Sequence, residues 1–357
     1  MAEPTAPMPH PAGKYPDKTV PFQRREGARS FYQGRGRYPS QRAYAALDLG
    51  TNNCRLLIAR PQADRFSVID AFSRIVRLGE GLSATGRLSD AAMNRTIAAL
   101  HICADKLMRR DVHLSRAVAT EACRSASNGA DFVRRVYAET GIALDVISNE
   151  EEARLAVLGC HNLLEPDDEP ALIFDIGGGS TELVLVDTRG AIPKIINWLS
   201  VPWGVVSLSE AVPEGAGDQV ARLASYEIMR GHVRKSFATF AAQTAGRTAT
   251  RLLGTSGTVT TLGSVYLKLD SYDRNLIDGL IVPAADLSAI SQDLARRSLD
   301  ERAALTCIGY ERADLVVAGC AILEEIMALW PAEHVAIADR GIREGILRRL
   351  MAERGRK

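Results

Sequence analysis

The sequence predicts an α/β protein in which two related domains, each with a mixed sheet, face each other across a central cleft. Two segments repeat one pattern: an apolar run ending in Asp, a polar turn containing glycine, and a second apolar run. They are residues 46–52 and 173–181, and their aspartates, Asp48 and Asp175, lie 127 residues apart (175 − 48), about the length of one domain. Such a pair indicates two β-hairpins that present carboxylates and backbone amides to one phosphate-bearing ligand. Strands alternating with helices indicate the α/β class, and the hairpins argue against a purely parallel sheet.

Bulk composition narrows the class of protein further. The 357 residues suffice for two hydrophobic cores, and 46% hydrophobic and 24% charged residues are ordinary for a globular protein. The net charge of +1 gives no overall attraction to nucleic acid or membrane, so we expect neither as a stable partner. The six cysteines lack Cys-x-x-Cys spacing, which indicates reduced thiols rather than a disulfide framework or zinc site. With no membrane-spanning apolar run and no apolar signal core, we expect a cytoplasmic protein.

Residues 1–42 differ in composition from the rest of the chain. They are rich in Pro, Gly and Arg with few aliphatic residues, so we expect a disordered basic tail. Eight Lys or Arg against three Asp or Glu leave an excess of five positive charges (8 − 3). The tail fits a weak tether to an anionic surface or RNA, but it fits better a solvated segment with no required role.

The first folded domain is expected at residues 43–165. Its pattern predicts three strands, a helix capped by Ser89, a strand, a polar turn, a helix, a short strand, and a helix opened by a capping box at Ser148–Glu151. The predicted ranges are 43–48, 54–60, 66–73, 89–110, 116–119, 120–128, 130–140, 143–147 and 148–163. The polar, proline-bounded segment 166–170 is the predicted domain boundary.

The second domain, expected at residues 166–340, restarts with the same hairpin pattern. Strands are predicted at 171–176, 182–187, 193–200, 249–253 and 335–338. Helices are predicted at 219–242, directly after 254–258, at 286–297 and at 313–329. A terminal helix at 342–351, within residues 341–357, is expected to pack back on the first domain.

The turn that follows Asp175 contains three consecutive glycines and two hydroxyl residues, namely Gly177, Gly178, Gly179, Ser180 and Thr181. Glycine permits close approaches that a Cβ would block, so the amides and hydroxyls of this turn can form a nest for phosphate oxygens. Asp175, at the end of a strand, is placed to hold a hydrated Mg²⁺ or to orient a water molecule. A tight hairpin alone would also explain the glycines, but the matching first turn favours phosphate binding.

The first turn offers the same parts with a single glycine: Asp48, Thr51, Asn52 and Asn53. Arg55 lies just beyond it, on a strand whose alternate side chains face the cleft. It therefore either contacts a phosphate or faces solvent.

A third segment of small residues comprises Gly254, Thr255, Ser256, Gly257 and Thr258. It follows an apolar strand and opens a helix, whose free N–H groups and positive dipole end favour an anion. It lacks the Lys of a Walker A loop, which excludes a P-loop. Capping of the helix would explain the same residues without a ligand.

Hydrolysis of a phosphate also needs a base that deprotonates the attacking water. Three glutamates, residues 150–152, lie in the first turn of a predicted helix, where the dipole favours any carboxylate. Neighbours on a helix point about 100° apart, so only one or two of them can face inward. Because Glu151 is the predicted capping-box partner of Ser148, Glu152 is the better candidate for the base.

Further charged residues lie in turns or at helix starts. Arg124 in the turn 120–128 can clamp a phosphate, and Glu121 is a second candidate base or a partner for that arginine. The charged residues of 312–314 and 339–345 are explained mostly by capping. The six histidines show no metal-ligand spacing.

Together these segments resemble the exopolyphosphatase/guanosine pentaphosphate phosphatase (Ppx/GppA) family over residues 44 to about 352. The segments that match in order are Ala46–Arg55, the Arg124 turn, Ser148–Leu155, Asp175–Glu182, Gly254–Thr258, Arg312–Asp314 and Gly341–Gly345. The resemblance implies the actin-like fold that this family shares with sugar kinases and heat-shock chaperones. It also implies hydrolysis of terminal phosphates with Mg²⁺.

Carried over residue by residue, the resemblance implies that Glu152 activates water and that Arg124 binds phosphate. Asp48 and Asp175 would position the metal, and residues 51–53 and 177–181 would cradle the phosphates. The family's usual Ser-Asn-Ser is replaced here by residues 51–53, Thr-Asn-Asn, which keeps polar donors and leaves the phosphate spacing open. Long members carry an extra helical C-terminal region absent from this sequence, so the resemblance does not extend to threading of long chains.

We therefore expect an exopolyphosphatase that removes terminal phosphate from inorganic polyphosphate, with Mg²⁺ as cofactor. A guanosine pentaphosphate 5′-phosphohydrolase would use the same machinery. A sugar or acid kinase of the same fold and a weakly catalytic sensor of guanosine polyphosphates are further alternatives. The expected ligand is inorganic polyphosphate or a guanosine polyphosphate, and a homodimer stays open.

Overall fold

The computed structural model describes residues 42–62, 65–167, 169–190, 192–215, 217–245 and 251–352. The predicted basic tail, residues 1–42, lies outside the described residues except for its last position. None of the helices in these ranges is both long and apolar enough to cross a membrane.

The first sheet has five strands in the order β3-β2-β1-β4-β5. The strands are β1 (Ala43–Leu49), β2 (Asn53–Gln62), β3 (Arg65–Ile75), β4 (Val112–Ala119) and β5 (Leu144–Val146). The first three form an antiparallel meander, whereas β4 pairs parallel with both β1 and β5. The sheet is therefore mixed, as the hairpin opening predicts.

The second sheet repeats this arrangement in the order β10-β11-β9-β6-β7-β8. Its strands are β6 (Ala171–Ile176), β7 (Thr181–Asp187), β8 (Lys194–Val201), β9 (Arg251–Thr255), β10 (Ile281–Pro283) and β11 (His334–Ala338). Here β6, β7 and β8 form the antiparallel meander, β9 pairs parallel with β6, and β11 pairs parallel with β9. The edge strand β10 is added antiparallel to β11. This duplicated topology confirms the expected actin-like fold with two mixed sheets.

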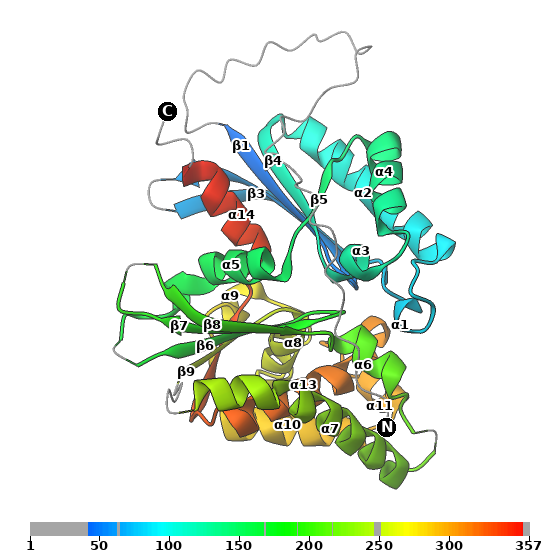
Figure 1. Cartoon of the computed structure of the whole chain (residues 1–357), viewed down its shortest axis with the longest axis vertical. Helices are drawn as coiled ribbons and strands as arrows, with labels where there is room; N and C mark the ends of the chain where they lie inside the picture. Colours follow the sequence, from blue (N-terminus) through cyan, green and yellow to red (C-terminus); the bar gives the residue numbers. More distant parts are fainter. Residues whose placement is uncertain are drawn as a thin grey trace, which may run out of the picture.

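Helices cover both faces of each sheet (Figure 1). Those before β6 are α1 (Leu82–Thr85), α2 (Asp90–Arg109), α3 (Glu121–Ser125), α4 (Gly129–Thr140) and α5 (Asn149–Cys160), with a 3₁₀ turn at His161–Leu163. Those between β8 and β11 are α6 (Val205–Ala211), α7 (Gln219–Thr244), α8 (Gly257–Tyr266), α9 (Arg274–Ile277), α10 (Ala284–Arg296), α11 (Leu299–Ala303), α12 (Tyr310–Ala313) and α13 (Val316–Leu329). The last helix of the described residues is α14 (Ile342–Ala352).

The central strand of each sheet is apolar on both faces because both faces are covered. In β1, Ala45 and Leu47 pack with α2 and α4, while Tyr44 and Ala46 point to the opposite face and pack with α14. The same alternation holds in β6, whose two faces contribute to two different hydrophobic clusters. A nearly continuous apolar run is the expected signature of such a doubly covered strand.

Two helices, α5 and α14, lie between the sheets (Figure 1). The apolar face of α5 packs on the second sheet, whereas α14 packs on the first. The two helices lie so close together that a Cβ on Gly159 would overlap the carbonyl oxygen of Gly341. A Cβ on Gly345 would likewise overlap the carbonyl oxygen of Leu155. We propose that this helix pair forms the junction between the predicted domains, residues 43–165 and 166–340.

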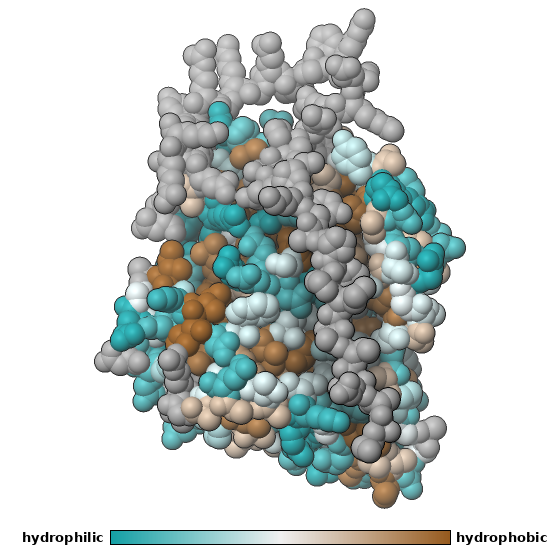
Figure 2. Space-filling model, viewed as in Figure 1, coloured by the Kyte–Doolittle hydropathy of each residue, from teal (hydrophilic) through white to brown (hydrophobic). Residues whose placement is uncertain are grey.

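Several short elements differ from the expected ones. The predicted turn 120–128 contains a short helix, α3, and the helix predicted to end at 163 finishes as a 3₁₀ turn after Cys160. The helix expected at 313–329 begins at Val316 and is preceded by α12. Figure 2 shows mixed hydropathy over one face of the molecule, with hydrophobic residues gathered on the left beside the second sheet.

Candidate active site

A cleft of about 140 Å³ lies between the two sheets. The part of the chain before β6 lines it with Asp48, Gly50, Thr51, Asn52, Asn53, Arg55, Thr120, Glu121 and Glu152. Residues from β6 to α13 line it with Asp175, Ile176, Gly177, Gly178, Gly179, Ser180, Glu182, Val205, Thr255, Ser256, Gly257, Thr258, Thr261, Arg312, Leu315 and Val316. The end of β11, the connecting residues and the start of α14 add Ala338, Asp339, Arg340, Gly341, Ile342 and Arg343.

The loop between β1 and β2 is held in shape by backbone hydrogen bonds. The Gly50 amide donates to the Asn53 carbonyl at 2.9 Å and closes the turn. The carbonyls of Thr51 and Asn52 accept from the segment after β3, so their own side chains are left to face the cleft. Thr51 and Asn52 are both buried, which means that they form the cleft floor rather than an open surface.

The loop between β6 and β7 presses directly against this first loop. A Cβ on Gly179 would lie 2.6 Å from Oγ1 of Thr51, and one on Gly178 would lie 3.0 Å from the Asn52 amide nitrogen. Real Cβ atoms essentially never show a contact of 2.6 Å and rarely show one of 3.0 Å, so glycine at these two positions lets the loops lie this close. The turn itself is closed by the Gly177 amide, which donates to the Ser180 carbonyl at 2.9 Å.

The third loop joins β9 to α8 and completes this wall of the cleft. Ser256 has a φ of 97° and donates from Oγ to the Ile176 carbonyl at 2.7 Å, which ties this loop to the second one. Thr255 donates from Oγ1 to the Arg340 carbonyl at 2.7 Å. This loop leads into the N-terminus of the ten-residue helix α8, which gives the site free amides and the positive end of the helix dipole.

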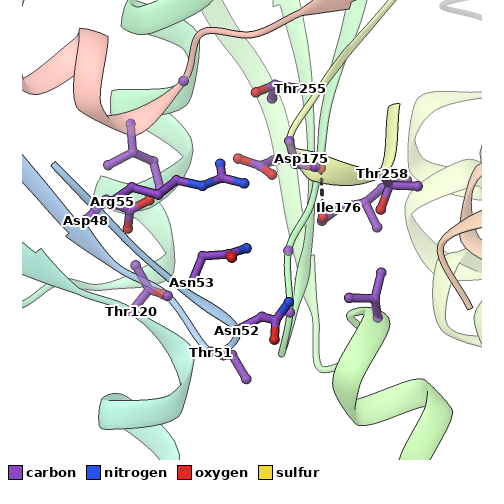
Figure 3. A pocket seen from close by; sticks show the side chains of 18 of the residues that line it. Asp48, Thr51, Asn52, Asn53, Arg55, Thr120, Asp175, Ile176, Thr255 and Thr258 are labelled. Carbon is purple, nitrogen blue, oxygen red and sulfur yellow. Dashed lines mark hydrogen bonds between the residues drawn. The ribbon is translucent and has the colours of Figure 1, made fainter. Parts of the chain in front are cut away.

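Arg55 extends from β2 toward Asp175 on the opposite wall (Figure 3). The position of a Cβ on Gly257 would be 3.5 Å from Nη2 of Arg55, so the guanidinium reaches the start of α8. Burial and the neighbouring Arg343 lower the pKa of Arg55, while Asp48, Asp339 and Asp175 raise it. Of the two roles predicted for this residue, the cleft-facing one matches its position.

Asp48 and Asp175 face the same space from the two hairpins (Figure 3). Burial raises the pKa of Asp48, and burial together with the charge of Asp48 raises the pKa of Asp175 to about 6. Oδ1 of Asp48 and Oδ1 of Asn52 are both buried, and neither has a hydrogen-bond partner among the described residues. Buried oxygen acceptors without donors are suited to a cation, and Mg²⁺ binds through one or two carboxylates plus substrate phosphates. The described residues contain no group of three or more His, Cys, Asp or Glu side chains placed to hold a metal.

Glu152 enters the cleft from the first turn of α5. Its side chain is buried, with 7% of the residue exposed. Burial and the charge of Glu182 raise its pKa well above the ordinary value, while Arg124 acts in the opposite direction. A carboxylate with a raised pKa in a cleft is typical of a general base.

The cap of α5 is only half of the predicted capping box. Oγ of Ser148 accepts from the Glu151 amide at 3.2 Å, as expected. The Glu151 carboxylate does not return to the Ser148 amide but accepts from Arg116 at 3.0 Å and Arg349 at 2.7 Å. The reciprocal bond predicted here was wrong because two arginines offer stronger, charge-assisted bonds.

Arg124 lies behind the cleft lining rather than in it. Nη1 donates to the Ile147 carbonyl at 2.6 Å and to Oε2 of Glu152 at 3.2 Å, and Nη2 donates to Glu121 at 2.6 Å. Glu121 is thus a partner of Arg124 and also lines the cleft, and its role as a second candidate base stays a prediction. Phosphate binding by Arg124 stays a prediction.

Two further predicted phosphate ligands lie outside the cleft lining. Thr181 is fully buried and donates from Oγ1 to the Trp203 carbonyl at 2.6 Å. Gly254 is enclosed by Phe174 and Val259, whose side chains a Cβ would overlap. Their roles in supporting the second and third loops follow from these contacts.

The cleft also contains charged residues that the motifs did not single out as functional. Glu182 lies opposite Asp175 in the β6–β7 register, and burial with the charge of Asp175 raises its pKa to about 7. Ser200 donates to it at 2.8 Å, and Asn149 donates to Ser200 at 2.6 Å. Period-two alternation from Ser180 along β7 would have pointed to Glu182.

Arginines enter the same cleft from two other segments. Arg312 lines it from α12 and donates to Oγ1 of Thr261 at 3.2 Å. Arg343 lines it from α14, and its charge acts on both Asp48 and Arg55. Their place in the cleft could not be predicted from the sequence, because both lie near the start of a helix, where capping explains such charges equally well.

The model of the Ppx/GppA phosphatase family matches residues 57–354. Exopolyphosphatase 2 of Mycobacterium tuberculosis is 33% identical over 292 residues, which cover 79% of this chain and 89% of that protein.

Solved structures of similar shape agree with the fold. The Aquifex aeolicus member of the Ppx/GppA family has a TM-score of 0.72 at 26% identity, with 88% of this chain and 98% of that chain covered. An exopolyphosphatase from Cytophaga hutchinsonii has a TM-score of 0.80 at 24% identity, covering 87% and 98%. The second likeness supports the fold alone.

Proposed function

The chain belongs to the Ppx/GppA phosphatase family, and on this premise we propose that it is an exopolyphosphatase that removes the terminal phosphate of inorganic polyphosphate. The reaction is attack of water on the terminal phosphorus, with phosphate as one product and the shortened chain as the other. Catalysis of phosphoryl transfer depends mostly on positioning and on stabilising negative charge.

The three loops supply most of the groups that bind phosphate oxygens. Residues 51–53 offer side-chain hydroxyl and amide donors, and residues 177–180 and 255–258 offer amides and hydroxyls. Arg55 adds a charged fork of donors between the two walls. Because the loops contact each other, these donors converge on one terminal phosphate rather than on separate ligands.

Glu152 accepts the proton of the attacking water in this proposal. Burial raises the pKa of Glu152, which strengthens it as a base, while the ion pair with Arg124 opposes this rise. Glu182 lies near enough that its negative charge also raises the pKa of Glu152. The proton leaves the water as the oxygen–phosphorus bond forms, and the negative charge of the leaving chain stays on its phosphate.

Asp48 and Asp175 would hold Mg²⁺, because both carboxylates face the cleft and the buried Oδ1 of Asp48 has no hydrogen-bond partner in the described part of the chain. When bound, Mg²⁺ would neutralise the charge that develops on the phosphate oxygens. Without a cation, two charged carboxylates at this position would repel a polyanion, and burial raises the pKa of both.

One observation carries the proposal above all others: the buried Glu152 lines the same cleft as the first two loops, which touch each other. A kinase of this fold would need a pocket for an acceptor alcohol beside the phosphate. The placement of Glu152 favours water as the acceptor instead.

The test is phosphate release by the purified protein with Mg²⁺ on long-chain polyphosphate and on guanosine pentaphosphate in parallel. Glu152→Gln should lower turnover roughly 10²- to 10⁴-fold while ligand binding persists. Glu150→Gln is the matched control, because Glu150 lies in the same turn but is exposed and paired with Arg154 at 2.6 Å.

Each outcome assigns a function. Faster release from polyphosphate supports the exopolyphosphatase, and faster release from the nucleotide assigns the guanosine pentaphosphate 5′-phosphohydrolase. Binding of guanosine polyphosphate without release from either substrate assigns the sensor. Near-normal turnover of the Glu152→Gln variant would remove Glu152 from the mechanism.

A further inference from the structure

Arg77 and Asp314 join the two walls of the cleft. Nη1 of Arg77 donates to Oδ2 of Asp314 at 2.7 Å, and Nη2 donates to Oδ1 at 3.1 Å. Nη2 also donates to the Glu311 carbonyl at 3.2 Å. Two parallel bonds from one guanidinium to one carboxylate fix direction as well as distance, which a single charge pair does not.

Each partner is tied to the wall from which it comes. The amides of Val76 and Arg77 donate to the Asn52 carbonyl at 2.8 and 3.0 Å, so Arg77 is anchored on the first phosphate loop. Asp314 lies between Arg312 and Leu315, and both of these line the cleft. The pair therefore connects the first loop to the α12–α13 wall by a short chain of bonds.

The backbone at Arg77 is strained, with a φ of 47°. A non-glycine residue in this region is kept there only where its surroundings fix it. Arg95 does so, because Nε donates to the Val76 carbonyl at 3.1 Å and Nη2 donates to the Arg77 carbonyl at 3.3 Å. The strained conformation aims the Arg77 side chain across the cleft at Asp314.

A second contact lies beside this pair. The Gly81 amide donates to Oε1 of Glu210 at 2.7 Å, which joins the start of α1 to α6. In Figure 1, α1 and α6 lie next to each other on the right, whereas α5 and α14 lie between the sheets to their left. The cleft is thus bounded on one side by the helix pair and on the other by polar bonds between side chains and loops.

We propose that Arg77 and Asp314 form a latch that holds the cleft walls at the separation the substrate requires. The helix pair is packed through apolar side chains and stays joined, whereas the latch is half-exposed, with 34% and 38% of its side chains accessible, and can open. Both are positioning residues for the reaction. The substrate in this inference rests on the proposed function, but the closing of the cleft does not.

The first test measures the cleft directly. Spin labels at Ala91→Cys on α2 and Ala304→Cys after α11, both exposed positions, report the distance between the walls by electron paramagnetic resonance. Cys307→Ser removes the half-exposed thiol nearest to these sites. The distance distribution should broaden in Asp314→Asn and Arg77→Lys, which keep the size of the side chain, and stay unchanged in the control Arg87→Ala, an exposed arginine of the same segment.

The second test is kinetic. The KM for polyphosphate should rise roughly three- to tenfold in each variant, with a smaller change in kcat, as expected for loss of a partly exposed bidentate pair. Since the two residues act through one contact, the double variant Arg77→Lys/Asp314→Asn should be no worse than either single variant. Thermal unfolding of each variant shows that the fold is retained.

An unchanged distance distribution, or an unchanged KM, would overturn the latch. So would additive effects in the double variant, because they would mean that the residues act separately. If polyphosphate is not hydrolysed at all, the proposed function fails, and the spin-label distances still decide whether Arg77 and Asp314 hold the cleft closed.

Discussion

Nη1 of Arg124 donates to Oε2 of Glu152 at 3.2 Å and links α3 to α5 directly behind the cleft. The same guanidinium is held by Glu121 and by the Ile147 carbonyl, so its direction is fixed from three sides. Its charge opposes the upward shift that burial imposes on the pKa of Glu152. The arginine is therefore placed to orient the proposed base and to limit the rise of its pKa.

Arg124→Gln should consequently lower kcat roughly 10- to 100-fold while KM changes little, because misplacing a base affects the chemical step more than binding. Arg134→Gln, at an exposed position of α4, is the control. Steady-state kinetics on polyphosphate measure both constants. A rise in KM with kcat retained would instead support the role of phosphate ligand that the family resemblance implies.

Gly179→Ala should separate the two phosphate loops, because the new Cβ would lie 2.6 Å from Oγ1 of Thr51. We expect the free energy of unfolding to fall by about 1–3 kcal/mol and the KM to rise. Gly231→Ala is a matched control, since no atom of the described residues lies within 4 Å of a Cβ at that exposed position of α7. The control should gain stability of about 0.5–1 kcal/mol in urea unfolding. Equal stabilities of the two variants would show that the loops do not need the glycine.

Asp48→Asn should abolish the response of the protein to Mg²⁺. In the unmodified protein, Mg²⁺ with phosphate should raise the Tm, and a concentration of 100 times Kd corresponds to about 2.7 kcal/mol of stabilisation. Chelation should reverse this shift. The metal-free variant should be at least as stable as the parent, since the buried, unpartnered carboxylate is gone. Asp105→Asn, on the exposed face of α2, is the control; a Tm shift retained by Asp48→Asn would exclude Asp48 as a ligand.

The stability of the metal-free protein should depend on pH through Glu182. Its pKa is about 7 in the native protein against an ordinary value of 4.5, chiefly because it is buried. Between these pH values the native state binds more protons than the unfolded chain, so the free energy of unfolding falls as the pH rises through this window. Glu182→Gln should remove part of that fall, on the order of 1–3 kcal/mol between pH 5 and pH 8. Urea unfolding of both proteins in chelator at the two pH values is the measurement, and parallel pH profiles would contradict the assignment.

The hairpins could be predicted from sequence because their information is local. An apolar run, an Asp and a glycine turn are contiguous, and the observed β1 exceeds the predicted strand 43–48 by one residue. The strand β10 and the short helices α6 and α12 have no such signal. Three-residue β10 exists because it pairs with β11, about fifty residues further along the chain, and such a pairing leaves no periodicity to detect.

The residues of the candidate site also fall into those predicted from local motifs and those that depend on contacts between distant segments. Glu152 and the residues of the three loops belong to contiguous motifs, and the structure brings most of them together in one cleft. Glu182 depends on strand register, and Arg343 depends on how α14 packs against the first sheet. Arg124 contacts Glu152, and Arg77 contacts Asp314, through side chains that come from different segments of the chain. No pattern in a single sequence predicts such contacts. The cytoplasmic location and a homodimer stay predictions.

The packing of α14 on the first sheet also sets the order in which the protein can be completed on the ribosome. Tyr44, Ala46 and Val118 form an apolar surface whose cover includes Ile346 and Leu347, made some two hundred residues later than Val118. The large core beneath the second sheet needs nothing beyond Ile337 and can close first. A nascent chain halted before α14 would therefore have a complete hydrophobic core beneath the second sheet, while one apolar face of the first sheet stays exposed. Such exposed apolar surfaces bind chaperones or aggregate. In this protein the part translated first is the part finished last.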